Sequence, residues 1–244
     1  MSFLKAEWRK LAIANYAIDK DHLMEFVPAG TELDLWNGKC FVSLVGFMFK
    51  NTKLLGIKIP YHINFEEVNL RFYVKRLENG EWKRGVVFIK EIVPKRALTF
   101  VANTVYKENY ETMPMSHKWI ENEDSRIVQY NWGKSEKENK FEVTASKESV
   151  EIISGSETEF ITEHYWGYAK VNTLKSNEYE VTHPKWEVYN VKDYKIKVDF
   201  GNIYGKKFDF LNFTEPDSVM LAEGSQITVE NKKTIKTSPQ EDYK

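Results

Sequence analysis

The residue with the clearest potential for chemistry is Arg71, which alternates with Tyr73 inside residues 68–91, a stretch with one apolar face and one mixed face. A guanidinium held inside a β-sheet can bind a carboxylate or phosphate through two parallel hydrogen bonds. It can equally pair with a glutamate or aspartate of a neighbouring strand. Because residues two apart in a strand share a face, Tyr73 is expected beside Arg71, as a hydrogen-bond donor or a packing group.

The stretch around Arg71 is predicted to be a β-hairpin. Asn79-Gly80 tolerates the positive φ angles of a two-residue turn and separates two strand-like runs. This turn sets Glu78 opposite Glu81 and fixes the register. Because like charges directly across a strand pair repel, an acidic group, solvent or a bound anion is expected near Lys75 and Arg84. The apolar face then pairs Val74, Phe72 and Leu70 with Gly85, Val87 and Ile89, and the mixed face pairs Tyr73 with Val86, Arg71 with Phe88, Asn69 with Lys90 and Lys75 with Arg84.

Further candidates follow from this register. Phe88 shares the face of Arg71 and is expected in the same wall. Lys90 falls on that face too, where a desolvated lysine near another cation has a lowered pKa and can act as a base or Schiff-base nucleophile. The alternative for Lys90 is an exposed strand end. Tyr106 and Tyr110 border a segment that crosses the sheet, and either cap a cavity mouth or simply pack.

His164 and His183 are either an acid/base pair or two separate structural groups. The five histidines fall in no metal-ligand spacing, so no metal site is expected. The sequence contains no nucleophile elbow, Walker loop or dinucleotide-binding glycine motif, so no cofactor is expected and these enzyme classes are excluded. The single cysteine, Cys40, lies in an apolar run and is interpreted as a buried, inert thiol.

The composition is that of a soluble globular protein. Hydrophobic residues make up 42% of the 244 residues and charged residues 29%, with a formal net charge of -1. This net charge argues against a general affinity for nucleic acid or anionic membranes, so neither is an expected partner. No secretory signal and no apolar run of membrane-spanning length is seen, and a cytoplasmic location is therefore expected. Oligomerisation is left open.

The pattern along the chain predicts a β-rich α+β fold. Short helices are expected over residues 7–17 and 22–27, and another from about Glu157, where Ser156 and Glu159 have capping-box spacing. Without internal repeats or linkers, residues 1–233 are predicted to be one domain, followed by a disordered polar tail at 234–244. The expected strands besides the hairpin are 39–50, 54–61, 96–106, 126–132, 140–145, 166–172, 179–183, 186–191, 194–200 and 218–222.

Several of these segments, in this order, resemble the YqjF-like family, domain of unknown function 2071, of the acetoacetate decarboxylase-like superfamily. The likeness covers roughly residues 8–222. One departure is His164, where the family usually has arginine. The similar motifs are Asn69-Leu70-Arg71-Phe72-Tyr73-Val74, Gly85-Val86-Val87-Phe88, Phe160-Ile161-Thr162-Glu163-His164-Tyr165, His183-Pro184-Lys185-Trp186 and the proline-glycine turn leading to an aspartate at residues 28–34.

The resemblance implies an antiparallel sheet curled into a cone or barrel around a cavity. The superfamily's decarboxylases form a Schiff base through a lysine in a G-x-P-K-K-like segment. The matching position here, residues 109–113, contains no lysine, and Pro94-Lys95-Arg96 lies too early in the chain. Decarboxylation by that route is therefore not expected.

Three hypotheses remain. The first is a protein that binds a small anionic, carboxylate-type molecule in the cavity, with Arg71, Tyr73, Phe88, Tyr110 and His183 as ligand-binding residues. The second is an enzyme acting on a carboxylate or keto acid, with Lys90, Tyr106 or His164 transferring protons. The third is a structural or interaction module whose interior is filled.

Overall fold

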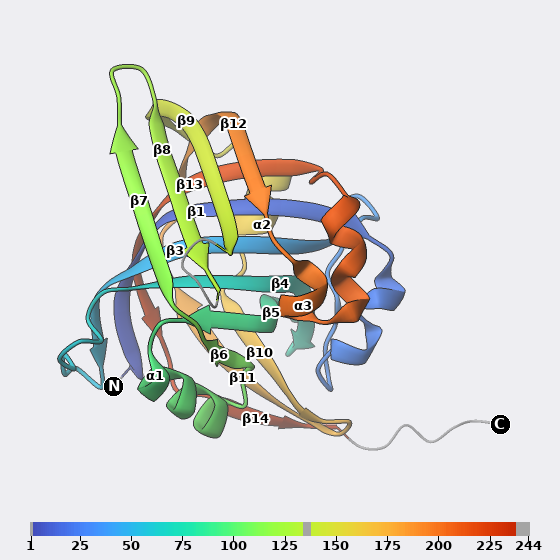
Figure 1. Cartoon of the computed structure of the whole chain (residues 1–244). Helices are drawn as coiled ribbons and strands as arrows, with labels where there is room; N and C mark the ends of the chain where they lie inside the picture. The colour runs from blue at the N-terminus through green and yellow to red at the C-terminus, as the bar shows by residue number, and fades with distance from the viewer. Residues whose placement is uncertain (1, 134–137, 238–244) are drawn as a thin grey trace.

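A strongly curled β-sheet with a few short helices at its edges forms the fold (Figure 1). The computed structural model describes residues 2–133 and 138–237. Within these ranges the strands form one 14-stranded sheet with the order β14-β11-β10-β5-β4-β3-β1-β13-β12-β9-β8-β7, while β2 pairs with β4 and β6 with β5. The strands are β1 (Leu4–Ile18), β2 (Glu32–Leu33), β3 (Cys40–Leu54), β4 (Phe65–Glu78), β5 (Glu81–Val93), β6 (Tyr110–Thr112), β7 (Met115–Glu121), β8 (Arg126–Trp132), β9 (Asn139–Glu151), β10 (Trp166–Asn172), β11 (Lys175–Thr182), β12 (Glu187–Lys197), β13 (Ser218–Val229) and β14 (Lys233–Lys236).

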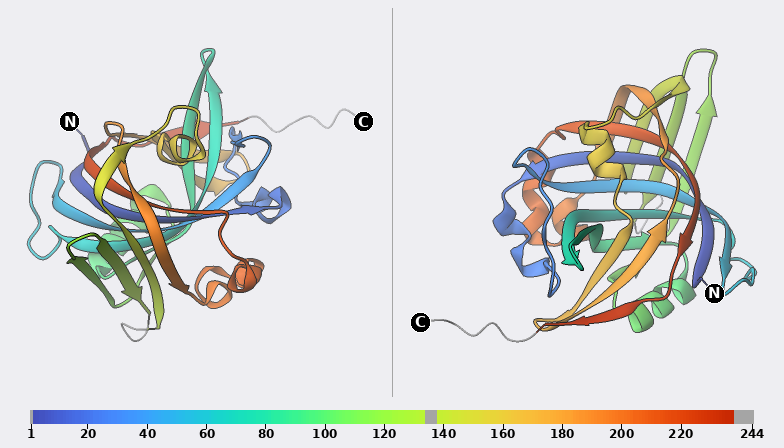
Figure 2. Two further views of the ribbon diagram at one scale, coloured as in Figure 1. Left: turned by 90° about the horizontal axis from the view of Figure 1, so that it is seen from above. Right: turned by 180° about the vertical axis from the view of Figure 1, so that it is seen from behind.

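A second pairing of β11 bends the sheet back on itself. Besides pairing with β10, this strand pairs with the end of β13 through Val181↔Val229 and Thr182↔Thr228. Strands β13, β1, β3, β4, β5, β10 and β11 are therefore paired in a closed succession, and the views in Figure 2 show the curl of the sheet. The helices are α1 (Arg96–Val101), which runs into the π-helix η3 (Ala102–Tyr106), together with α2 (Glu157–Thr162), α3 (Phe200–Tyr204) and the 3-10 helices η1 (Lys20–His22), η2 (Met24–Phe26) and η4 (Lys206–Phe213).

Apolar side chains cover both faces of the central strands, which explains their nearly continuous apolar sequences. Along β3, Val42 and Leu44 pack into the core beneath β8, β9 and α3, whereas Val45 and Phe47 pack into the core on the concave side. Cys40 is buried, and burial raises the pKa of its thiol to about 11, as expected for an inert thiol.

The predicted hairpin is confirmed at its turn. Asn79 and Gly80 have φ angles of 54° and 84°, and Glu78 pairs with Glu81. The predicted register continues as far as Arg71↔Phe88 and then shifts, because Ile89 forms a β-bulge. Beyond the bulge Leu70 pairs with Lys90 and Asn69 with Glu91, so the predicted pairs Leu70–Ile89 and Asn69–Lys90 are wrong.

Acidic groups do lie beside the two facing cations of the hairpin, as predicted. The Lys75 ammonium is 3.3 Å from a carboxylate oxygen of Glu32, and the Arg84 guanidinium is 2.6 Å from a carboxylate oxygen of Asp34. Both acids come from the β2 region, which pairs with β4 beside these cations.

Several predicted elements are wrong. Residues 7–17 form part of β1, because β3 and β13 pair with it on both sides and its apolar run is buried on both faces. Residues 96–106 form α1 and η3 rather than a strand. Residues 55–61 form an exposed loop, and 233–236, assigned mostly to the tail, form β14 against β11. Residues 238–244 lie outside the described residues.

The predicted helix after Ser156 is confirmed as α2. The Ser156 hydroxyl accepts a hydrogen bond from the Glu159 backbone N–H at 3.2 Å. The Glu159 carboxylate accepts from the Gly155 N–H at 2.7 Å. In the described residues no helix is long and apolar enough to cross a bilayer.

Candidate functional site

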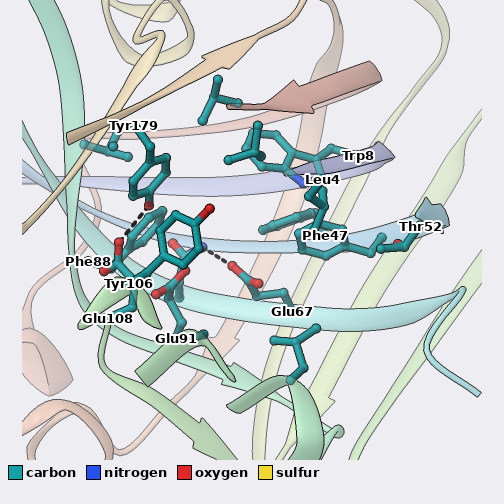
Figure 3. A pocket seen from close by; sticks show the side chains of 18 of the residues that line it. Leu4, Trp8, Phe47, Thr52, Glu67, Phe88, Glu91, Tyr106, Glu108 and Tyr179 are labelled. Carbon is teal, nitrogen blue, oxygen red and sulfur yellow. Dashed lines mark hydrogen bonds between the residues drawn. The ribbon is translucent and has the colours of Figure 1, made fainter. Parts of the chain in front are cut away.

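The concave side of the curled sheet encloses a cavity of about 230 Å³ (Figure 3). Its walls are mostly aromatic and aliphatic. Trp8 and Phe47 meet edge to face with ring centroids 5.3 Å apart, and Phe49 stacks on Phe65 at 4.7 Å. Polar side chains gather at particular places on this apolar wall, and they come mainly from β4, β5, β11, β6 and the segment between η3 and β6: Glu67, Asn69, Arg71, Glu91, Glu108, Tyr110 and Tyr179.

Strand β4 supplies Glu67, Asn69 and Arg71 to the cavity. These residues are two apart, so the alternation of a strand turns them to the same face. The Asn69 amide donates a hydrogen bond of 2.9 Å to the Glu67 carboxyl group. The amide oxygen of Asn69 is buried and has no partner among the described residues.

The β-bulge at Ile89 brings Glu91 into the same cavity. A single extra residue in one strand reverses the facing of every side chain beyond it. Glu91 therefore takes the face that a regular hairpin would give to Lys90, and it is 3% exposed. One carboxyl oxygen of Glu91 is buried without a hydrogen-bond partner among the described residues.

Glu108 completes the acidic cluster, defined here as Glu67, Glu91 and Glu108. It follows Lys107, whose left-handed conformation (φ 64°) ends η3 and turns the chain towards the cavity. The Tyr179 hydroxyl donates a hydrogen bond of 2.8 Å to Glu108, and the Tyr110 hydroxyl donates one of 3.2 Å to Glu67. Figure 3 shows the three carboxyl groups converging beneath Tyr106 and Tyr179.

The cavity disfavours ionisation of these carboxyl groups. Burial raises the pKa of Glu67 to about 7, against the opposing effects of hydrogen bonds from Asn69 and Tyr110 and of the Arg71 charge. Burial and the charge of Glu67 raise the pKa of Glu108 to about 8. Burial, together with the negative charges of Glu108 and Glu67, raises the pKa of Glu91 well above its usual value. The acidic cluster therefore holds protons near neutral pH.

Arg71 is the one lysine or arginine among the described residues that line the cavity. It is 7% exposed, and its guanidinium carbon lies 5.7 Å from the centre of the Tyr73 ring. Its Nε is buried without a hydrogen-bond partner among the described residues. Within the described part of the chain, no carboxylate lies within salt-bridge distance of Arg71. A buried guanidinium with unsatisfied donors is costly unless an acceptor completes its hydrogen bonds.

His164 lies in the cavity wall and has its own structural partner. Its Nε2 is 3.2 Å from a carboxylate oxygen of Asp34, which also accepts a hydrogen bond of 2.6 Å from Arg84. Burial lowers the pKa of His164 to about 4, so the ring is neutral at physiological pH. Burial alone would raise the pKa of Asp34, but hydrogen bonds from His164 and Arg84 hold it below its usual value.

His183 also contributes to the wall, from the segment between β11 and β12. Its ring stacks on Trp186 with centroids 4.4 Å apart, and its Nδ1 lies 2.9 Å from the Pro184 carbonyl oxygen. Burial lowers the pKa of His183. No hydrogen bond links His183 to His164 in the described structure, and each histidine has separate partners. The described residues contain no group of three histidine, cysteine or acidic side chains arranged to hold a metal ion.

The family model of DUF2071, described as an uncharacterized conserved protein, matches residues 5–226. The chain belongs to this family. It is 25% identical over 199 residues to the uncharacterized protein YqjF of Bacillus subtilis (strain 168), an alignment that covers 78% of this chain and 76% of that protein. This confirms the resemblance seen in the sequence motifs.

Solved structures similar to this DUF2071 chain have the acetoacetate decarboxylase-like fold. Acetoacetate decarboxylase from Legionella pneumophila superposes with a TM-score of 0.63 at 13% identity, covering 95% of this chain and 86% of that one. The enduracididine biosynthesis enzyme MppR, complexed with the condensation product of pyruvate and imidazole 4-carboxaldehyde, gives 0.65 at 11% identity, covering 97% and 90%. An acetoacetate decarboxylase-like enzyme from Sphingomonas wittichii RW1 gives 0.63 at 8% identity, covering 98% and 95%. At such identities the likeness establishes the fold.

The structure brings most of the predicted site residues of this family member to one cavity. Its lining contains Arg71, Phe88, Tyr106, Tyr110, His164 and His183. Tyr73 lies beyond its edge, where it packs against Phe160 and His164 and shares a 2.8 Å hydrogen bond with the Ser43 hydroxyl. Lys90 does not line the cavity either; its ammonium is 2.7 Å from the Glu111 carboxylate, because the bulge turns it away.

The acidic cluster was missed in the sequence. The signal that would have identified Glu67 is the alternation Glu67-x-Asn69-x-Arg71, which places three polar groups on one face of a strand. The inward position of Glu91 depends on the β-bulge, and that of Glu108 on the left-handed conformation of Lys107. Neither feature can be predicted from the local sequence. No lysine is among the described residues that line the cavity.

Proposed function

We propose that this protein binds a small carboxylate-bearing molecule in the cavity, with Arg71 as the anchor. The supporting observation is that Arg71 is buried in the cavity wall while no carboxylate of the described residues lies within salt-bridge distance of it. A ligand carboxylate can supply the missing acceptors and accept two parallel hydrogen bonds from the guanidinium. The Nε of Arg71 is buried without a partner among the described residues, so a ligand that accepts its hydrogen bond gains binding energy.

The remaining walls define what else the ligand carries. Trp8, Phe47, Phe49 and Phe88 provide apolar surface for a compact hydrophobic body. The acidic cluster and the Asn69 amide oxygen present hydrogen-bond acceptors, so a hydroxyl or amine on the ligand finds partners there. An empty cavity of about 230 Å³ argues against an interior filled by the protein's own side chains. The fold neighbour MppR has a solved structure in complex with pyruvate, a small carboxylate, which supports this choice of ligand class.

Thermal-shift screening of carboxylic acids against the native protein, Arg71→Met and Arg71→Lys tests the anchor. Acids that raise the melting temperature of the native protein should raise that of Arg71→Met little or not at all, since methionine keeps the aliphatic stem but offers no donor. Arg71→Lys should show an intermediate shift because it keeps one charge without the planar fork. Lys195→Ala, at an exposed site, is the matched control. Equal shifts in native protein and Arg71→Met would refute Arg71 as the anchor.

A second candidate function is proton transfer at a carbon next to the carbonyl of a bound keto acid. It is favoured by Glu67 and Glu108, whose pKa values of about 7 and about 8 suit acid–base exchange near neutral pH. One carboxylate removes the proton, and the same or a neighbouring carboxyl group returns one from solvent. Incubation of pyruvate or 2-oxobutanoate in D₂O with native protein and with Glu67→Gln, followed by proton NMR, tests it. Deuterium should enter the ligand faster with the native protein than with Glu67→Gln or with no protein, and an equal rate with both proteins would exclude Glu67 as the base.

A further inference from the structure

The mouth of the cavity carries an unusual concentration of exposed apolar side chains. Two segments form it: the loop of residues 55–62 and the helical segment of residues 96–106. Ile59 and Val101 line the cavity and are nevertheless 40% and 36% exposed, so the cavity reaches the surface between these segments. Figure 1 and the rear view in Figure 2 place both segments at the same end of the molecule. The exposed apolar residues of this face are Leu55, Ile57, Ile59, Tyr61, Phe100, Val101 and Val105.

Most of the surface of several of these apolar side chains is exposed to solvent. Ile57 is 69% exposed, Tyr61 88% and Phe100 71%. In α1 no residue is buried; Ala97, Leu98 and Val101 line the cavity, whereas Phe100 does not. Exposed apolar side chains gathered at one end of a molecule are a feature of interaction sites, because water is displaced from them on binding.

The lysine and arginine residues of these two segments are not balanced by acidic residues within them. Residues 51–64 and 94–107 contain no aspartate or glutamate, although the whole chain has 36 acidic and 35 basic residues. None of the basic side chains in these ranges has an ion-pair partner in the described structure. The acidic residues that border them are already paired, Glu7 with Arg9 and Glu66 with His117. The basic residues are Lys53, Lys58, Lys95, Arg96 and Lys107.

We propose that this face, called here the mouth face, docks on anionic lipid bilayers. Apolar and aromatic side chains that enter the interface, ringed by lysine and arginine at the level of acidic headgroups, are the features of peripheral membrane contact. The net charge of -1, from which no membrane partner is expected, averages over the chain and does not describe this face. Docking would place the cavity opening against the bilayer, so that an amphipathic carboxylate could enter from the lipid phase.

A second copy of the chain fits this face less well. A two-fold symmetric dimer through the mouth face would set the same unpaired lysines and arginine against one another. Like charges brought together across a partly desolvated interface repel. An anionic bilayer instead complements both the charge and the apolar side chains.

Co-sedimentation with vesicles tests the proposal. Full-length protein should pellet at least about five-fold more with phosphatidylcholine:phosphatidylglycerol 7:3 vesicles than with pure phosphatidylcholine, and the excess should fall when NaCl rises from 0.1 to 0.5 M, because salt screens the attraction. Phe100→Ser and the pair Lys58→Glu/Arg96→Glu should each lose most of this binding. Phe213→Ser and Lys195→Glu are matched controls at exposed sites outside the mouth face, since Phe213 is 88% exposed and the Lys195 side chain 66%.

Circular dichroism establishes that each variant is folded before it is compared. Equal pelleting with both vesicle types, or equal loss in Phe100→Ser and Phe213→Ser, would overturn the proposal. Light scattering in solution supplies a further test. A dimer of the native protein that Phe100→Ser converts to monomer would assign the mouth face to a second copy and also overturn it.

Discussion

At the scale of single residues, Glu67 makes the stability of the fold depend on pH. It is 2% exposed, and burial raises its pKa to about 7 from the ordinary value of 4.5. Between these two values the folded chain therefore keeps a proton that the unfolded chain has lost. Because the folded state binds more protons, the stability that Glu67 contributes is present below about pH 4.5 and is lost as the pH rises through about 7.

Glu67→Gln should flatten the pH dependence of stability over this window. A full proton corresponds to about 1.4 kcal/mol of unfolding free energy per pH unit, and glutamine cannot ionise. Urea denaturation at pH 5.5 and 7.5 measures the difference, with the exposed Glu148→Gln as the control. Native protein and Glu148→Gln should both lose stability between these pH values, and Glu67→Gln should lose less. A slope unchanged by Glu67→Gln would mean that its carboxyl group is not a proton holder of the cavity.

At the scale of elements, the cavity wall depends on the contact between β5 and β10. These strands pair in parallel through Trp166↔Gly85 and Gly167↔Val86. A Cβ placed on Gly85 would lie 2.5 Å from the Trp166 carbonyl oxygen and 2.6 Å from the Tyr168 ring. Glycine at this position thus permits the close approach that joins the hairpin to β10.

Gly85→Ala should lower the free energy of unfolding by about 1–3 kcal/mol, because the backbone of β10 must move to relieve the clash. Gly38→Ala is the comparison: nothing lies within 4 Å of its Cβ, but its φ of +79° costs an alanine about 1 kcal/mol. Near-UV circular dichroism should also change in Gly85→Ala, since Trp166 is displaced, and stay unchanged in Gly38→Ala. If Gly85→Ala kept a native near-UV spectrum and lost less unfolding free energy than Gly38→Ala, the contact between β5 and β10 would accommodate a Cβ without strain.

The elements also show what the sequence could predict. The turn at Asn79-Gly80, the capped helix after Ser156 and the inward position of Arg71 depend on local chemistry or strand alternation, and all three are confirmed. Residues 7–17 and 96–106 were misassigned because short apolar runs fit either period, and tertiary pairing decided between them. The acidic cluster could not be predicted for a different reason. The extra residue Ile89 shifts the register of β5, so that Glu91 rather than Lys90 faces the cavity.

At the scale of the whole molecule, β11 holds the curled sheet closed. It contacts β10 on one side, and on the other it pairs with β13 near Val181 and with β14 over residues 175–178. Its side chain Tyr179 holds Glu108 in the acidic cluster, and the Asn177 amide donates a 2.8 Å hydrogen bond to the Tyr106 carbonyl oxygen. Closure of the sheet and assembly of the cavity are therefore linked through the same strand.

Removal of β14 should loosen the cavity without unfolding the chain. A chain ending at Lys232 loses the backbone pairing of β11 with residues 233–236 and the 3.1 Å hydrogen bond from Thr234 to Asn177, but it keeps the β11–β13 pairing. Compared with a chain ending at Thr237, it should melt several degrees lower, since about 1 kcal/mol shifts the melting temperature of a domain this size by about 2–4 °C. Hydrogen exchange should accelerate at the amides of residues 175–178 and stay slow in β3 and β4. Equal melting temperatures and equal exchange in β11 would show that β13 alone keeps the sheet closed.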